Sequence, residues 1–357
     1  MKFEDILEIK NGRNQRAVEN PRGKYPIYGS GGIMGYADDY ICDAYTVIIG
    51  RKGNINNPIF VEEPFWNVDT AFGLSANTDV ILPRFLYYFC KKFDFERLNK
   101  TVTIPSLTKS DLLKIEIEPP NLLQQRDIVE RLTKIERIIA LRKLELKLLD
   151  ELIRARFVEM FGDIRYEEKY QGIPLRRLCT TISGGTPSTK CSEYYEGNIP
   201  WISTVSLGPN YIDGSTAKGY ITQEAIDNSA TKLIPAGNIL FGTRVGVGKS
   251  SINDVALCIN QDIVAIVGID TNRFNVLFIK YVLDTYQSYY DSIKKGATIL
   301  GITGDDLKNT LIPVPPLELQ NQFADFVKVV DKSKAVVQKA LDQTQQLFDS
   351  LMQEYFG

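Results

Sequence analysis

Apolar side chains between residues 119 and 162 recur at alternating steps of four and three, which is the spacing of a coiled-coil seam. The seam residues are Ile128, Leu132, Ile135, Ile139, Leu146, Leu149, Ile153 and Met160, with Arg142 and Arg156 as polar interruptions. The two prolines that open this stretch cannot occupy a helix interior, and the glycine that closes it is a common C-terminal stop. We therefore predict one long helix over this range.

The same pattern occurs a second time over residues 315–357. The seam positions there are Phe323, Val327, Val330, Val337, Leu341, Phe348, Leu351 and Tyr355, with Lys334 and Thr344 as the polar interruptions. The two stretches begin with PPNLLQQ and PPLELQNQ and end with EMFG and EYFG, which identifies them as repeats. Because each helix can bury its apolar stripe only against a partner, we predict an antiparallel coiled coil within one chain, with pseudo-twofold symmetry. A coiled coil between copies of the chain is the alternative.

The segments that precede the two helices share a weaker repeat. TVIIGRKGNINNPI corresponds to NILFGTRVGVGKSSI, and TIPSLTKSDL corresponds to TILGITGDDL. We predict strand, loop and strand over residues 46–61, a glycine- and tyrosine-rich loop over 24–40, and an amphipathic helix over 83–98. The predicted class is α+β. Its parts are two similar α/β domains, residues 1–118 and 163–314, and the long helices that follow them, residues 119–162 and 315–357.

Composition excludes several classes of activity. The 357 residues include no histidine, which removes Ser-His-Asp and Cys-His nucleophile systems. The five cysteines are odd in number and form no CxxC pair, so neither a disulfide framework nor a zinc site is predicted. No apolar run has membrane-spanning length and no signal-peptide pattern is evident, so we expect a cytoplasmic protein. The net charge of −2 argues against a generally basic nucleic-acid binder, although local basic patches suffice for duplex contact.

Two motifs resemble nucleotide-binding loops but fail in detail. GTRVGVGKS, at residues 242–250, places its first glycine one position too early for a P-loop, and GSGG, at residues 29–32, does not satisfy GxGxxG. We interpret the first as the tip of a hairpin and the second as a loop. The Asn-Pro-Pro-aromatic and Asp-Pro-Pro-Tyr motifs of amino-methyltransferases do not occur, so we predict that the chain does not methylate by itself. An enzyme is the least favoured of the function classes.

Basic and amide side chains gather in a glycine-rich hairpin of both domains. Arginine and lysine can bind guanine O6/N7 or phosphate, and asparagine can pair with adenine, so we predict that these hairpins bind DNA. The hairpin candidates are Arg51, Lys52, Asn54 and Asn56 in the first domain and Thr243, Arg244, Lys249 and Ser250 in the second. The candidates in neighbouring loops are Tyr28, Ser30, Thr186, Ser188, Lys190, Trp201 and Ser203. The occurrence of the pattern in both halves favours a binding surface over merely solvated turns.

Together these features resemble the specificity (S) subunit of a type I restriction-modification enzyme. The resemblance is carried by the PPxxLQQ and PPLELQNQ helix entries, the MFG and YFG exits, SGGTPSTKCSEYYEGNIPWIS in the second domain, and YPIYGSGGIMGY with IIGRKGNI in the first. It implies two target recognition domains, each of which reads half of a split asymmetric site in double-stranded DNA. The first domain has NGRNQR in place of GGTPS, so the contacts implied for Thr186 and Ser188 do not carry over to it.

The resemblance also implies partners and cofactors. The helices would act as a spacer and dock two methyltransferase (M) subunits, which use S-adenosylmethionine to methylate adenine N6. Restriction (R) subunits would use ATP and Mg²⁺, while this chain would hold no cofactor or metal. The residues predicted to form the coiled coil and subunit interface are Ile128, Leu132, Ile135, Arg142, Leu149, Phe323, Val327, Val330, Leu341 and Phe348. A two-headed protein-interaction scaffold without nucleic acid binding is the alternative.

Overall fold

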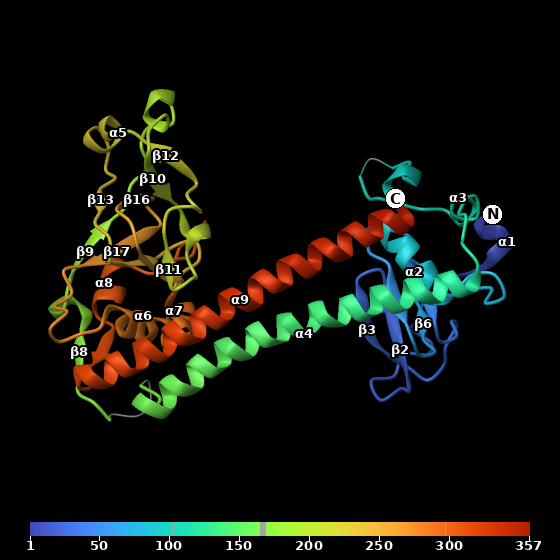
Figure 1. The fold of residues 1–357 in the computed structure, drawn as a ribbon, viewed down its shortest axis with the longest axis horizontal. Helices are drawn as coiled ribbons and strands as arrows, with labels where there is room; N and C mark the ends of the chain where they lie inside the picture. The colour runs from blue at the N-terminus through green and yellow to red at the C-terminus, as the bar shows by residue number, and fades with distance from the viewer. Residues whose placement is uncertain (102, 165–168, 297) are drawn as a thin grey trace. The chain divides into compact units, whose positions relative to one another are not determined.

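The computed structural model divides the chain into two compact units (Figure 1). Unit 1 is Met1–Leu146 with Val336–Gly357, and unit 2 is Lys147–Ala335. The described residues are 1–101, 103–164, 169–296 and 298–357. Each unit contains one globular domain together with part of α4 (Leu122–Phe161) and part of α9 (Leu317–Phe356). The two stretches with coiled-coil spacing are therefore helical, and the α+β class is confirmed.

The globular part of unit 1 contains two sheets and three short α-helices. Its elements are α1 (Phe3–Ile6), β1 (Leu7–Asn11), β2 (Tyr25–Gly29), β3 (Gly32–Ala37), β4 (Thr46–Gly50), β5 (Ile59–Val61), β6 (Trp66–Asn67), β7 (Ala71–Ala76), α2 (Pro83–Lys92), the 3-10 helix η1 (Phe95–Leu98) and α3 (Lys109–Leu112). One sheet has the order β1-β7-β4-β5 and is antiparallel, and the other has the order β3-β2-β6. Helix α2 packs Phe85 and Leu86 into the core against the first sheet.

The globular part of unit 2 is larger, and its described strands form three sheets, two of which correspond to the sheets of unit 1. Its strands are β8 (Gly172–Pro174), β9 (Thr180–Ser183), β10 (Ile199–Ile202), β11 (Tyr211–Ile212), β12 (Gly219–Ile221), β13 (Leu233–Ile234), β14 (Ile239–Gly242), β15 (Ser250–Asn253), β16 (Leu257–Ile259), β17 (Ile263–Val267) and β18 (Leu311–Pro313). Its helices are α5 (Gln223–Asp227), α6 (Val276–Thr285), α7 (Gln287–Ile293) and α8 (Gly304–Lys308), with 3-10 helices η2 (Leu175–Arg177), η3 (Ser192–Tyr195) and η4 (Thr204–Ser206).

Strand order shows that the two units are versions of one domain. The order β9-β17-β14-β15 in unit 2 repeats β1-β7-β4-β5 of unit 1, with β11 added beside β15. The order β12-β10-β16 likewise repeats β3-β2-β6, including the parallel pairing of the last two strands in each set. The weak sequence repeat therefore corresponds to a repeated topology, as predicted.

Two local predictions for unit 1 were wrong. Residues 24–40 are not a loop, because β2 and β3 form an antiparallel hairpin whose turn is completed by Gly32 with φ of 120°. The predicted helix over residues 83–98 ends at Lys92, since Phe93 adopts an extended backbone. Asp94 then starts η1 by accepting a hydrogen bond from the N–H of Glu96. Apolar periodicity continues across this break, which is why the sequence favoured one helix.

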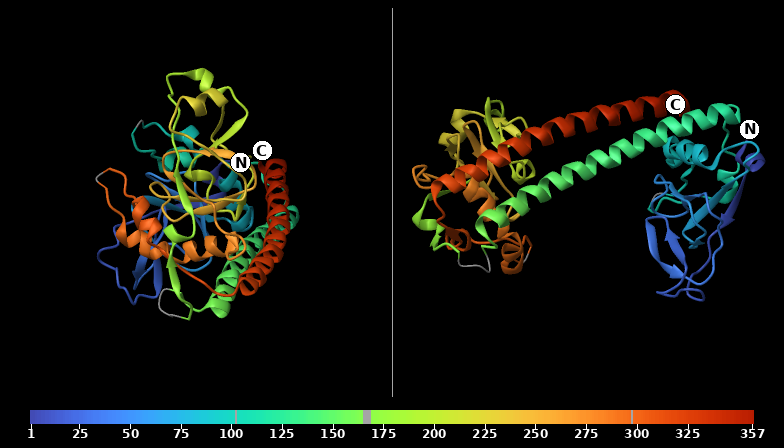
Figure 2. Two further views of the ribbon diagram at one scale, coloured as in Figure 1. Left: turned by 90° about the vertical axis from the view of Figure 1, so that its left-hand side faces the viewer. Right: turned by 60° about the horizontal axis from the view of Figure 1, so that its bottom comes forward.

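Within each unit, a segment of α4 lies beside an antiparallel segment of α9 (Figures 1 and 2). In unit 1, the early seam of α4 packs against the late seam of α9 through Leu132, Ile139, Leu341 and Phe348. In unit 2, the seam is formed by the opposite ends of the helices, where aromatic rings dominate. Phe157 and Phe323 have ring centroids 5.3 Å apart in an edge-on arrangement, which gives this end a broad apolar contact.

A buried glutamine joins each long helix to its globular domain. Gln125 accepts a hydrogen bond from the N–H of Leu82 (2.8 Å), at the start of α2, and donates to the carbonyls of Val80 (2.9 Å) and Pro120 (2.8 Å). Gln320, 195 residues later, accepts from the N–H of Asn275 and donates to the carbonyls of Arg273 and Pro315. Both side chains are completely buried. The glutamines of the PPxxLQQ and PPLELQ motifs thus fix each helix relative to the helix that covers the sheet.

Candidate nucleic-acid interface

The predicted basic hairpin exists in both units and folds back closely after its first glycine in each. In unit 1 it connects β4 to β5, and in unit 2 it connects β14 to β15. Gly50 and Gly242 end the first strand of each hairpin. A side chain at Gly50 would lie 2.0 Å from the carbonyl oxygen of Asn54, and one at Gly242 would lie 2.6 Å from that of Gly246. Each hairpin therefore folds back on itself four residues after a glycine, and only glycine fits there.

Unit 1 presents its basic side chains to solvent. Arg51, Lys52 and Asn54 are exposed in the hairpin loop. The guanidinium of Arg51 lies over the ring of Phe72, 5.9 Å from its centroid, and donates a long hydrogen bond, 3.4 Å, to the carbonyl oxygen of Asp69. Ser30 approaches the same loop, donating to the carbonyl oxygen of Lys52 at 3.4 Å. Loops from β2–β3 and β4–β5 thus meet, and the arrangement presents two cations and an amide that are able to bind phosphate or base edges.

Unit 2 holds its arginine more firmly. The Nε of Arg244 lies 2.7 Å from the carboxylate of Asp262, and its guanidinium also donates to the carbonyl oxygen of Gln261 at 2.9 Å. Arg244 keeps a partly exposed side chain, and Lys249 is exposed. The hydroxyl of Thr186 donates to the side-chain oxygen of Gln261 and is exposed. Two predicted candidates, Thr186 and Arg244, are therefore brought to one place by Gln261.

Several predicted contact residues turn out to be interior. Trp201 is buried and its indole N–H donates to the carbonyl oxygen of Gly185, while Thr243 is buried and bonds to the carbonyl oxygen of Asp262. Ser250 is also buried and donates to the carboxylate of Asp284. Asn56 is exposed, but its amide holds η1 through Asp94 and the N–H of Phe95. In this conformation the first three side chains are covered. Thr243 and Ser250 tie the hairpin to its surroundings, whereas Trp201 ties β10 to the loop at Gly185.

The remaining candidates lie on loops of unit 2 and on strand β2 of unit 1. Ser188 and Lys190 are exposed and Ser203 is half-buried, all in unit 2. Tyr28 is half-buried on β2 of unit 1, where its ring packs edge-on against Phe65 and burial raises the pKa of its hydroxyl. Their assignment to DNA contact remains a prediction. Sequence reasoning missed Gln261 and Asp262, the partners of Arg244, because they lie just before β17, 17 residues or more after Arg244 in the sequence.

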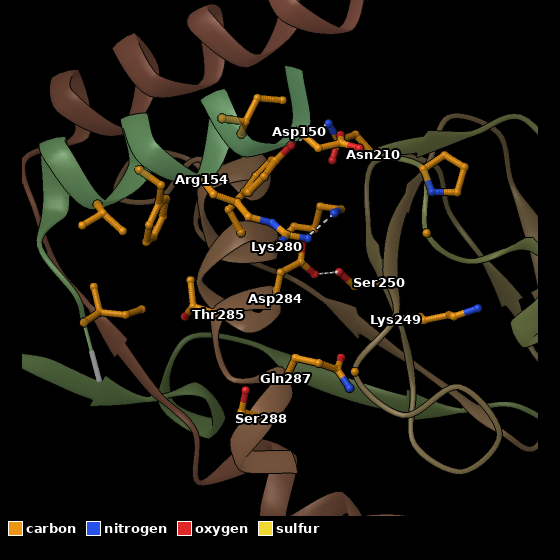
Figure 3. Close-up of a pocket in the computed structure, with 18 of the residues that line it drawn as sticks. Asp150, Arg154, Asn210, Lys249, Ser250, Lys280, Asp284, Thr285, Gln287 and Ser288 are labelled. Atoms are coloured by element: carbon orange, nitrogen blue, oxygen red, sulfur yellow. Dashed lines mark hydrogen bonds and ion pairs between the residues drawn. The ribbon is translucent and has the colours of Figure 1, made fainter. Parts of the chain in front are cut away.

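A cavity of about 870 Å³ lies behind the hairpin of unit 2, between α4, α6 and the base of β15 (Figure 3). The carboxylate of Asp284 lines this cavity. It accepts a hydrogen bond from the hydroxyl of Ser250 at 2.6 Å and pairs with the buried amine of Lys280 at 2.7 Å. Gln287 adds a second tie by donating to the carbonyl oxygen of Val247 at 2.9 Å. Arg154 points into the cavity from α4. These bonds fix the second hairpin to α6 and α7, which gives it a defined position before any ligand arrives.

The seam residues predicted for the two long helices lie where the helices pack. Leu132, Ile135, Phe323, Val327, Val330, Leu341 and Phe348 are buried, and Ile128 and Leu149 are partly buried. The polar interruptions are satisfied locally. Arg142 pairs with Glu145 at 2.8 Å, Arg156 pairs with Glu159 at 2.7 Å, and the Thr344 hydroxyl donates to the carbonyl of Ala340. Lys334 instead pairs with Asp150 of the neighbouring helix.

The cysteines of the chain are unpaired thiols. In the described parts of the chain the five cysteines are free, and no group of three metal-ligating side chains comes together. Burial raises the pKa of the Cys42 thiol to about 12 and that of Cys258 to about 11. Among the described helices, none has both the length and the apolar character needed to span a bilayer.

Comparison with known proteins identifies what this arrangement resembles. A family model described as the type I restriction modification DNA specificity domain matches residues 1–151 and 167–345. The type I restriction enzyme MjaIX specificity subunit of Methanocaldococcus jannaschii is 32% identical over 158 residues, which are 44% of this chain and 37% of that protein. The chain therefore aligns with little more than a third of that relative's length.

Two further similarities extend over nearly the whole chain. The putative type I restriction enzyme specificity subunit S.HindORF215P of Haemophilus influenzae is 25% identical over 370 residues, covering 97% of this chain and 92% of that protein. The solved S subunit of a type I restriction-modification system from M. genitalium has a TM-score of 0.66 at 16% identity, covering all of this chain and 95% of that one. The structural similarity shows a common fold of two domains and two long helices.

Proposed function

We propose a function from one premise: this chain belongs to the family of type I restriction-modification DNA specificity subunits. It would be the DNA-reading subunit of a complex in which other chains carry out the chemistry. Each domain would read one half of a split, asymmetric site in double-stranded DNA. The observation that carries this proposal is the hairpin built twice around Gly50 and Gly242, each with a cation within two residues of the glycine.

The chemistry of the two hairpins supports different half-sites. An arginine or lysine side chain can bind guanine O6 and N7, and either can bind phosphate, so the same fold can position different readers. Unit 1 offers Arg51, Lys52 and Asn54 with few internal bonds, whereas unit 2 offers Arg244 fixed by Asp262. Because the frame is shared and the presented side chains differ, the two units would prefer different base sequences.

The long helices would dock two methyltransferase (M) subunits. Helix α4 supports this because it exposes apolar side chains outside its seam. These are Ile138, Leu141 and Leu144 in unit 1 and Leu148, Leu152 and Val158 in unit 2, each about half exposed. In α9 the corresponding exposed residues are Val329, Val336 and Leu347. A second apolar face exposed to water is unfavourable, because its side chains remain hydrated. A partner helix that covers this face removes the unfavourable exposure.

Catalysis and cofactor binding would belong to the partner chains. The M subunits would bind S-adenosylmethionine and methylate adenine N6, and the restriction (R) subunits would use ATP and Mg²⁺. The absence of histidine from the sequence agrees with a subunit that performs no acid–base chemistry. The complex would act on cellular DNA in the cytoplasm. The number of helical turns in α4 and α9 would set the length of the unread gap between half-sites.

The decisive experiment is selection of duplexes from a random pool by the full chain together with its M subunits. We expect enrichment of two short conserved blocks separated by a fixed number of unread base pairs. Arg51→Ala should relax the preference at one block only, with a loss of about 1–3 kcal/mol if the side chain makes a bidentate base contact. Arg244→Ala, the matched variant in unit 2, should relax the other block.

Two outcomes would refute parts of this function. If the complex with M subunits enriched no sequence, the DNA-reading role would fail and a protein-interaction scaffold would become the better interpretation. If Arg51→Ala changed both blocks equally, the assignment of one domain to one half-site would be wrong. The spacer is tested separately, by inserting one turn at Arg142 and one at Val337. The unread gap should then lengthen while both blocks stay the same.

A further inference from the structure

An exposed isoleucine lies beside the basic hairpin in both units. Ile104 in unit 1 is 60% exposed, and Ile299 in unit 2 is 51% exposed. They occupy equivalent places in the repeat, since Ile104 belongs to TIPSLTKSDL and Ile299 to TILGITGDDL. Each lies on the loop that precedes a short helix, α3 or α8. Single exposed apolar residues are common, but one in the same place on two diverged domains calls for a physical reason.

The loop that carries the isoleucine is bonded directly to the hairpin. In unit 1 the N–H of Leu107 donates to the carbonyl oxygen of Arg51 at 2.9 Å. In unit 2 the N–H of Ile302 donates to the carbonyl oxygen of Thr243 at 2.8 Å. Arg51 and Thr243 each directly follow the glycine that shapes the hairpin turn, so the two bonds are equivalent. The isoleucine precedes the donor by three residues in each unit.

Further contacts keep each loop from folding away. Leu107 and Ile302 are buried and anchor the loop's end in the domain core. In unit 1, the N–H of Gly53 donates to the carbonyl oxygen of Pro105 at 2.9 Å, which ties the hairpin tip to the residue after Ile104. In unit 2, Gly301 exchanges two backbone hydrogen bonds with Lys295, of 2.8 and 2.9 Å, which closes the loop below Ile299. The loop that carries each exposed isoleucine is thus held against the hairpin that carries the cations.

An aliphatic side chain in this position has one specific use on a duplex. The cations of the hairpins can bind guanine or phosphate. Thymine differs in that it presents a 5-methyl group in the major groove, which is recognised by apolar contact. Isoleucine suits this contact because β-branching restricts its side-chain rotation, so little freedom is lost on binding. Ile104 next to Arg51 and Lys52 would therefore complement a groove that presents a methyl group near guanine or phosphate.

We infer that Ile104 and Ile299 are thymine-reading residues, each of which packs on a 5-methyl group in the half-site read by its own unit. This inference rests on the proposed function and adds a contact that the basic hairpins do not supply. Every half-site that contains a methylatable adenine contains an A·T pair and so offers a thymine. The two contacts are independent, because each belongs to a different unit and a different half-site.

Replacement of thymine by uracil tests the contact, since it removes only the methyl group. Duplexes carrying the selected site would be prepared with each thymine changed to uracil in turn, and affinity for the complex of full chain and M subunits would be measured. The native complex should lose about fourfold at one thymine in each half-site, the effect of one buried methyl-sized group. With Ile104→Ala, the uracil effect should vanish in one half-site and persist in the other. Ile299→Ala should show the reverse.

Val205→Ala is the control for simple loss of surface, because Val205 is 88% exposed in unit 2 but lies outside this loop. It should keep the uracil sensitivity of the native complex at both half-sites. The inference is overturned if the native complex tolerates uracil everywhere, or if Ile104→Ala keeps the full sensitivity of the native complex. Either result would leave the proposed function intact, because sequence selection by the native complex is measured first. Absence of any sequence selection would instead refute the proposed function itself.

Discussion

The buried amide of Gln125 gives the sharpest test of how a domain is joined to its long helix. It makes three hydrogen bonds of 2.8–2.9 Å, with backbone groups of Leu82, Val80 and Pro120. Gln125→Ala removes all three bonds. The backbone groups then stay buried without a hydrogen-bond partner, because a methyl group neither donates nor accepts. At about 1 to 1.5 kcal/mol per lost bond, the free energy of unfolding of unit 1 should fall by about 3 to 4.5 kcal/mol.

The two tryptophans of the chain allow each unit to be followed separately. Trp66 lies in unit 1 and Trp201 lies in unit 2, and both are buried, so their fluorescence should change on unfolding. In a Trp201→Phe background, urea titration reports unit 1. With a slope of about 2 kcal/mol/M, Gln125→Ala should lower the midpoint by about 1.5 to 2.3 M. Gln320→Ala should lower the midpoint of unit 2 by a similar amount, read from Trp201 in a Trp66→Phe background.

Gln322→Ala is the matched control, because Gln322 lies two residues along α9 from Gln320 and is exposed. It makes the same chemical change on the same helix and should leave the midpoint of unit 2 nearly unchanged. If Gln320→Ala shifted the midpoint by no more than this control, the hydrogen bonds would contribute little and the reasoning would be wrong. If Gln125→Ala lowered the midpoint of unit 2 rather than unit 1, the assignment of the bonds to unit 1 would also fail.

Three other predictions concern the hairpin, a buried tyrosine and a buried thiol. Gly50→Ala should reduce binding to one half-site at least tenfold in a duplex affinity assay, while Gly31→Ala, where a side chain would meet nothing within 4 Å, should not. Burial raises the pKa of Tyr88 to about 12, so unit 1 should lose stability as pH rises from about 10 to 12; Tyr88→Phe should weaken this loss in urea titrations across that range. Complete burial raises the pKa of the Cys90 thiol, so iodoacetamide at pH 8 should label it only after unfolding, as read by mass spectrometry.

The long helices were predictable because their signal is strong and repeated. A seam that keeps one register over many turns leaves few alternatives to a helix, and the flanking prolines and glycine place its ends. The β2–β3 hairpin was missed for the opposite reason. Its strands are short and contain Pro26, Gly29 and Gly35, residue types that sequence rules assign to loops. The pairing of β2 with β6, on its other side, stabilises it, and that contact is distant in sequence.

The position of the candidate site in the sequence was predictable, but the side chains that it exposes were not. The two glycine-rich hairpins follow from local sequence, and both exist. Which polar side chains face solvent depends on contacts from elsewhere in the chain. Ser250 turns inward because Asp284 of α6 accepts its hydroxyl, and Asn56 is engaged because Asp94 and Phe95 lie beside it. These partners are 34 to 39 residues away in sequence, beyond the reach of local patterns.

The division between what the two units share and where they differ fits a protein that reads two unlike half-sites. The shared features are structural: the glutamines Gln125 and Gln320, and the glycines Gly50 and Gly242. The differences lie in what the hairpins present. At the second position after the glycine, unit 1 has an exposed lysine, whereas unit 2 has Arg244, which Asp262 and Gln261 hold in place. A constrained arginine presents its donors in one direction and favours a single bidentate partner, whereas an exposed lysine can donate to acceptors in several directions.

Unit 2 should therefore tolerate fewer base substitutions at its hairpin position than unit 1. Asp262→Asn removes the carboxylate that holds Arg244 without changing the arginine itself, and should relax the base preference of unit 2. A half-site that stayed equally strict in Asp262→Asn, measured by duplex selection, would show that the carboxylate does not position the arginine.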